Sequence, residues 1–218
     1  MGLASSIPRI DINCALDAIS AKIIGGLTGK RSWKKYSKNM FLVLMPAKSL
    51  KKTIATKYCL SQNIMVYVVK DMLDLLLYGK QELIDHIELL REKDYRMYKA
   101  TIYNIAMIYL QSIKHTFNPA ITKIVLLHDD IGLAQHMKVP QGNIIKAMPD
   151  EPLFESIKET MEEEGKPIEG SELEKVIMER NVLKADSATR TFNFIEDFVD
   201  ILSNLTGLQK DLTKFMEF

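Results

Sequence analysis

The chain has 218 residues, of which 47 % are hydrophobic and 26 % charged, and its formal net charge at pH 7 is +1. This composition excludes an intrinsically disordered chain, and the length allows one domain or two small ones around a sizeable core. No apolar run approaches the roughly eighteen residues that a membrane-spanning helix needs, so none is expected.

The charges are divided unevenly along the chain. Residues 18–70 contain eleven lysines and arginines and no acidic residue, whereas residues 150–218 contain seventeen acidic and eight basic residues. This asymmetry predicts a basic N-terminal helical bundle over residues 1–140 and an acidic C-terminal helical region over residues 150–218. The two regions are either separate or parts of one continuous domain.

The first third of the chain shows one helical stripe and one ambiguous apolar run. Asp11 can cap a helix whose apolar residues recur at helical spacing until Gly25-Gly26 ends it. Residues 40–45 form a short apolar run that periodicity cannot assign to a strand or to a buried helix turn. Residues 63–78 are apolar nearly all round and predict a helix inside a bundle, with a minor two-stranded pairing to residues 40–45 as the alternative.

The remaining two thirds predict further helices. Residues 81–116 are expected to be helical with a break near Lys93-Asp94, and Asn118-Pro119 to start a helix that ends near residue 137. A connector is expected over residues 139–152. Acidic helices are expected to follow at residues 152–164, 171–184 and 187–205, with a last short helix at residues 207–218. The predicted fold is therefore all-α, with about eight helices and at most a minor two-stranded element near residues 40–45.

The basic stretch is the first candidate for function. Lysines neutralise phosphates without reading sequence, and aromatic rings interleaved with them can stack on unpaired bases. The residues expected to bind nucleic acid or another polyanion are Lys30, Arg31, Trp33, Lys34, Lys35, Tyr36, Lys38, Lys51 and Lys52. The alternative interpretation is a basic face that docks on the acidic third of the same chain, or of neighbouring copies in a homo-oligomer.

A second candidate is the segment His128-Asp129-Asp130, because adjacent His and Asp side chains can ligate a divalent metal. Residues 126–131, Leu-Leu-His-Asp-Asp-Ile, resemble the first aspartate-rich motif of isoprenyl diphosphate synthases, and residues 196–200 resemble a degenerate second motif. The resemblance implies an all-helical enzyme holding Mg²⁺ between the motifs and acting on diphosphate groups through Asp129, Asp130, Asp197 and Asp200. The chain departs from the first motif at Leu133, where the family has a third aspartate.

Two weaker motifs lie near the N-terminus. Gly2 fits the loose pattern for N-myristoylation, and acylation together with the basic cluster would give a peripheral membrane protein. Residues 25–32 are rich in glycine but lack a phosphate-loop pattern, because Ile24 stands at the first glycine position and Arg31 follows Lys30.

The sequence as a whole favours a non-catalytic structural or assembly protein of nucleocapsid or virion type, with no cofactor. Cys14 and Cys59 lie in apolar surroundings without a Cys-x-x-Cys spacing, which favours reduced thiols and a cytoplasmic location. The metal-dependent phosphate enzyme and the peripheral membrane protein are the alternatives.

Overall fold

The structure is a computed structural model that describes residues 38–47, 49, 51, 55, 64–113, 122–163, 172–193 and 200–201. Over these residues the chain forms a five-stranded sheet and six α-helices. The predicted all-α bundle is therefore wrong, and the fold is mixed α/β.

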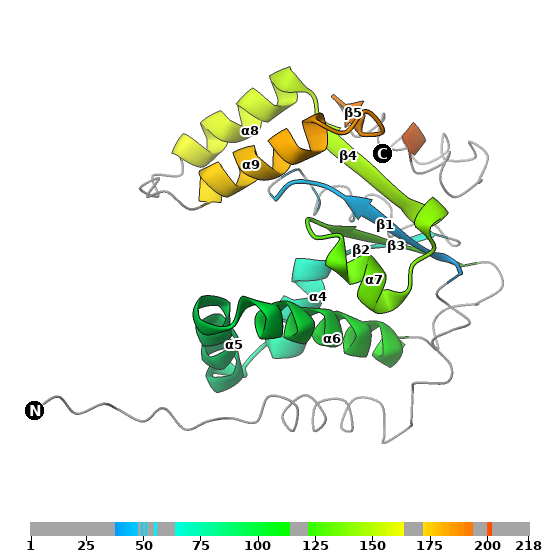
Figure 1. The fold of residues 1–218 in the computed structure, drawn as a ribbon. Helices are drawn as coiled ribbons and strands as arrows, with labels where there is room; N and C mark the ends of the chain where they lie inside the picture. Colours follow the sequence, from blue (N-terminus) through cyan, green and yellow to red (C-terminus); the bar gives the residue numbers. More distant parts are fainter. Residues whose placement is uncertain are drawn as a thin grey trace, which may run out of the picture. The chain divides into compact units, whose positions relative to one another are not determined.

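All strand pairs in the sheet are parallel, in the order β2-β3-β1-β4-β5 (Figure 1). The strands are β1 (Met40–Leu44), β2 (Ile64–Val68), β3 (Lys123–His128), β4 (Ile144–Pro149) and β5 (Arg190–Phe192). β1 is the central strand, because it pairs with β3 on one side and with β4 on the other.

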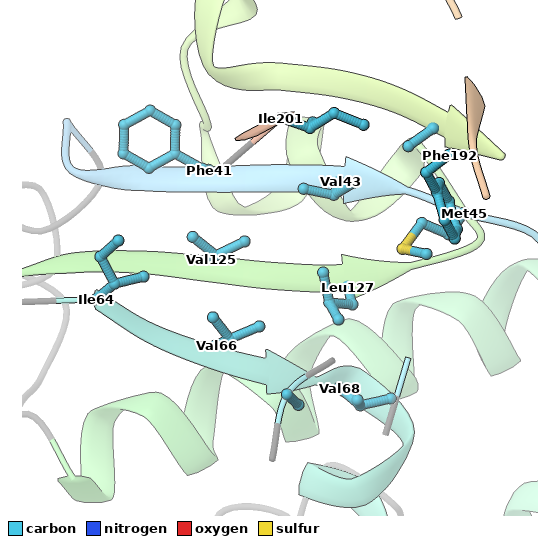
Figure 2. Close-up of a cluster of buried hydrophobic side chains, with 12 residues drawn as sticks. Phe41, Val43, Met45, Ile64, Val66, Val68, Val125, Leu127, Phe192 and Ile201 are labelled. Atoms are coloured by element: carbon cyan, nitrogen blue, oxygen red, sulfur yellow. The ribbon is translucent and has the colours of Figure 1, made fainter. Parts of the chain in front are cut away.

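The central strands β1 and β3 are buried on both faces, which explains the apolar runs that form them. Alternate side chains of three neighbouring strands, including Val43, Val125 and Val66, gather in one apolar cluster (Figure 2). Leu42 and Leu126 point to the opposite face and are also fully buried. Strands of parallel sheets are typically covered on both faces and read as continuous hydrophobic runs rather than alternating ones.

The strands account for each error in the predicted elements. Residues 40–45 and 64–69 do contain strands, but β1 and β2 each pair with β3 instead of with one another. β3 lies within the helix expected to run to residue 137, β4 within the expected connector, and β5 within the helix expected at residues 187–205. In short, continuously apolar runs of this kind, the spacing of apolar and polar residues does not distinguish a buried strand from a buried helix.

Two helices between β4 and β5 confirm the prediction within one residue at each end. α8 (Glu151–Glu163) and α9 (Glu172–Lys184) form an antiparallel pair, and α9 packs against β4 (Figure 1). The Asp150 carboxylate accepts the Leu153 N–H at 3.0 Å and so caps the start of α8. Between β3 and β4 lie the short helix α7 (Gly132–Met137) and the 3₁₀ turn η3 (Gln141–Asn143).

A separate compact unit contains the other three α-helices of the described residues. Lys70–Phe117 belongs to this unit, whereas the five strands and α7 to α9 belong to the other. Its helices are α4 (Val69–Leu77), α5 (Gln81–Lys93) and α6 (Tyr95–Ile113). The predicted break near Lys93-Asp94 is confirmed, because the Asp94 carboxylate accepts the Met97 N–H at 3.0 Å and starts a new helix. The predicted boundary between residues 140 and 150 stays a prediction.

Across the described ranges, no helix combines the length and the apolar character required to cross a lipid bilayer.

Candidate phosphate-binding site

The carboxyl ends of β1 and β3 lie side by side, and the chain after each of them carries polar residues. β1 continues into a turn in which the Ser49 hydroxyl donates to the Pro46 carbonyl, and Lys51 is already helical. The Met45 N–H donates to the His128 carbonyl at 2.8 Å, so the two strand ends are tied together. This strand–turn–helix unit stands where ligands bind in open α/β sheets, outside the carboxyl ends of the strands.

The strand order places a topological switch at β1. After β1 the chain leads to β2, beyond β3 on one side, whereas after β3 it leads to β4, beyond β1 on the other side. Connections that leave neighbouring strands in opposite directions open a crevice between them, and this crevice is the usual ligand site of such sheets.

Asp129 is the centre of the polar cluster at this edge. It directly follows β3, and its side chain is 22 % exposed. His128 Nδ1 lies 3.1 Å from Asp129 Oδ1, and Lys175 Nζ lies 3.3 Å from Asp129 Oδ2. Both carboxylate oxygens of Asp129 therefore have a partner within this structure.

α9 contributes the other half of the cluster. Lys175 Nζ is also 3.4 Å from Glu179 Oε1, one helical turn further along. The second oxygen of Glu179 accepts the Ala47 N–H at 2.8 Å. Glu179 therefore links α9 to the turn after β1, although the two residues are 132 positions apart in the chain.

Lys51 supplies the partly buried cation of the site. Burial lowers the pKa of Lys51, while the negative charges of Asp129 and Glu179 oppose this shift. Burial alone would raise the pKa of Asp129, but the interactions with His128, Lys51 and Lys175 together outweigh it and lower that pKa. Because His128 is neutral near pH 7, Lys51 and Lys175 keep Asp129 ionised there.

His128 and Asp130 have different roles from Asp129. Burial lowers the pKa of His128 to about 4, so the ring is an uncharged neighbour of the Asp129 carboxylate at neutral pH. Asp130 Oδ1 accepts the Gly132 N–H at 2.8 Å, which fixes the turn that leads into α7. Of the three residues singled out in the sequence, Asp129 is therefore the one best placed to meet a ligand.

The other predicted site residues are only partly described. Lys38 is exposed, Lys51 belongs to the cluster at the sheet edge, and Asp200 is an exposed helical residue. The predicted residues that lie outside the described ranges are Lys30, Arg31, Trp33, Lys34, Lys35, Tyr36, Lys52 and Asp197. Within the described ranges, no three His, Cys, Asp or Glu side chains are grouped so that they could hold a metal ion.

Sequence reasoning missed Lys175 and Glu179, because nothing in the chain order links α9 to β1. It also missed a signal in residues 46–53, which have the spacing of the phosphate-loop pattern and end in Lys52-Thr53. Pro46 and Lys51 replace the two glycines of that pattern. The match is therefore degenerate. A strand directly before these residues is the feature that supports a phosphate-loop match, and the sequence alone did not identify that strand.

The fold and the site together define a parallel α/β protein with a charged cluster at its topological switch. Comparison of the chain with protein-family models, with curated proteins and with solved structures gave no match.

Proposed function

We propose that the protein binds a phosphate-bearing ligand of the nucleotide type, together with Mg²⁺, at the carboxyl ends of β1 and β3. The observation that carries this proposal is the placement of a partly buried lysine, Lys51, and a carboxylate, Asp129, beyond the carboxyl ends of two neighbouring strands at the switch point of the sheet, where the two charges interact. This is a revised form of the metal-dependent phosphate chemistry that the sequence offered as an alternative.

The two residues suit the two parts of such a ligand. A lysine in the helix after the first strand can neutralise a phosphate, and a carboxylate after a neighbouring strand can hold Mg²⁺. Mg²⁺ usually takes one or two carboxylates and completes its shell with water and substrate phosphates. A three-residue metal cluster is therefore not required for this chemistry.

The departures from a full phosphate loop set the expected strength of binding. A glycine-rich loop surrounds phosphate with backbone N–H groups, whereas Pro46 has no N–H and Lys51 carries a side chain. We therefore expect side-chain charge to contribute more here, and the affinity to depend strongly on Lys51.

Isothermal calorimetry with Mg·ATP tests the proposal. Lys51→Met is expected to weaken binding at least about tenfold, because a hydrogen bond to a charged group contributes about 1.5–3 kcal/mol. Asp129→Asn should weaken the binding of Mg·ATP more than that of ATP in EDTA. Inorganic tripolyphosphate in place of ATP measures the share of affinity that the phosphates provide.

Lys184→Met is the matched control, because Lys184 lies on α9 and pairs with Glu151 at 3.5 Å rather than with the cluster. It should bind Mg·ATP as the wild type does. A wild-type protein that binds neither Mg·ATP nor tripolyphosphate at millimolar concentration would refute the proposal. Equal affinities for the wild type, Lys51→Met and Asp129→Asn would refute it too.

A further inference from the structure

Lys175 occupies one oxygen of the carboxylate that would hold Mg²⁺. Its Nζ lies 3.3 Å from Asp129 Oδ2, and the other oxygen of Asp129 faces His128 at 3.1 Å. A divalent cation that binds Asp129 through Oδ2 must therefore displace the ammonium group of Lys175. In the ligand-free chain, this ammonium group provides the positive charge that the metal would otherwise provide.

Lys175 can leave Asp129 without any change in the helix that carries it. Glu179 lies one turn further along α9 and is already 3.4 Å from Lys175 Nζ, so a second carboxylate stabilises the released cation. Glu179 also accepts the Ala47 N–H at 2.8 Å, which keeps α9 beside the turn after β1. The Lys175 side chain is 48 % exposed and thus has room to change rotamer.

The displaced ammonium group would lie beside the phosphates that arrive with the metal. Lys51 lies in the helical segment that follows β1, Asp129 directly follows β3, and α9 reaches the turn after β1 through Glu179. A metal–phosphate complex brings negative oxygens close to its cation. A lysine freed from Asp129 can then donate to one of these oxygens with a charge-assisted hydrogen bond.

We infer that Lys175 is a resident counter-ion of Asp129, which the incoming Mg²⁺ displaces and which then binds a phosphate of the same ligand. The inference rests on the proposed function and adds a second phosphate-binding lysine, contributed by α9. The exchange keeps a cation beside Asp129, and the additional positive charge of Mg²⁺ is balanced by the phosphates of the same ligand. It also makes metal binding depend on the phosphate, because metal alone must compete with Lys175.

The test compares metal alone with metal plus phosphate. Binding of Mn²⁺ without nucleotide is followed by the loss of the free-ion signal in electron paramagnetic resonance, and binding of Mg·ATP by calorimetry. Lys175→Met should bind Mn²⁺ about twofold to fivefold more tightly than the wild type, the size expected when one partner of a partly exposed ion pair is removed. The same variant should bind Mg·ATP more weakly. Lys184→Met, on the same helix, should change neither.

A second substitution and a double variant make the test specific. Lys175→Gln keeps a polar side chain and should behave as Lys175→Met does, so a folding defect in one variant does not decide the result. Asp129→Asn combined with Lys175→Met should lose the gain in Mn²⁺ affinity, because the gain depends on the freed carboxylate.

Three results would overturn the inference. Unchanged Mn²⁺ affinity in both Lys175 variants would refute it while the proposed function stands, provided that Lys51→Met and Asp129→Asn still weaken Mg·ATP binding. Tighter Mn²⁺ binding without any loss of Mg·ATP affinity would show that Lys175 competes with metal but does not contact phosphate. A wild-type chain that binds no Mg·ATP would refute both proposals.

Discussion

The His128 ring shows how one residue at the sheet edge links burial to charge. It is the last residue of β3, its side chain is 15 % exposed, and burial lowers its pKa to about 4. Because the ring is neutral at pH 7, the positive charges that stabilise the Asp129 carboxylate there come from Lys51 and Lys175. Protonation of His128 would add a third positive charge to the same cluster.

The lowered pKa of His128 predicts that the folded state loses stability as the pH falls from about 6.5 to about 4. In this window the unfolded chain takes up a proton on His128 and the folded chain does not. Each pH unit should therefore cost about 1.4 kcal/mol of the free energy of unfolding. The measurement is urea denaturation between pH 7 and pH 4 in the presence of EDTA, which keeps divalent cations off Asp129.

His128→Asn should reduce this slope, since asparagine does not titrate. The slope need not vanish, because burial also lowers the pKa of His136, which acts in the same direction. The lowered pKa of Asp129 acts at lower pH, below its ordinary value near 3.8, and is separated from the window of His128. An Asn variant with the slope of the wild type would contradict the assignment.

The sequence identified part of the site by residue type alone. The sequence singles out His128 and Asp129 because adjacent imidazole and carboxylate groups are metal ligands, and both lie at the carboxyl end of β3. Lys51 was grouped with the basic cluster, because charge counting cannot tell a partly buried lysine from an exposed one. Lys175 and Glu179 could not be found, because their connection to β1 exists only in three dimensions.

At the scale of elements, helices with polar faces were predictable and buried strands were not. α8 and α9 have charged residues that show where each helix starts and stops, and their predicted bounds agree within one residue. β1 and β3 are buried on both faces, so neither the period of two nor the helical period appears in their sequences. β4 lies just after Pro140 and ends in Pro149, which made it resemble a connector.

One buried arginine holds the two helices between β4 and β5 together. Arg180 on α9 has a side chain that is only 6 % exposed, and its guanidinium carbon lies 4.3 Å from the centre of the Phe154 ring on α8. It also donates to Glu151 at 2.6 Å, but the Glu151 side chain is 58 % exposed. Water therefore screens the ion pair, and the stacking on Phe154 with the buried stem carries most of the effect.

Arg180→Ala is expected to lower the free energy of unfolding by about 2 kcal/mol, through loss of a buried cation–π contact and of side-chain packing. The measurement is urea denaturation at pH 7, followed by circular dichroism.

Lys184→Met provides the control for Arg180→Ala, because Lys184 pairs with the same Glu151 oxygen from an exposed position. It should cost about 0.5 kcal/mol or less. Equal losses of stability in the two variants would show that the shared ion pair, and not the contact with Phe154, joins α8 to α9.

At the scale of the whole molecule, the charge asymmetry is partly neutralised within the chain. Lys51 comes from the basic stretch of residues 18–70, and it interacts electrostatically with Glu179 from the acidic third. The interpretation in which the basic and acidic regions dock on each other stays a prediction. Ten other basic residues belong to the same stretch, among them Lys34 and Lys35.

The cluster around Lys34 and Lys35 predicts salt-dependent binding of single-stranded nucleic acid. Each phosphate neutralised on a single strand contributes about 0.7 to the slope of log affinity against log salt. Replacing both lysines with glutamine should therefore reduce that slope by about 1.4 and weaken binding. Fluorescence anisotropy with a labelled oligonucleotide at several salt concentrations measures the slope.

The matched control replaces Lys158 and Lys184 of the acidic third with glutamine, which makes the same change in net charge elsewhere. If this control reduces the slope as much, the effect reflects total charge and not a local site. Size-exclusion chromatography with light scattering separates the remaining alternative. One outcome is that the protein forms oligomers that dissociate as the salt concentration rises, and that it does not bind the oligonucleotide. This outcome would mean that the basic stretch docks on the acidic region of another copy.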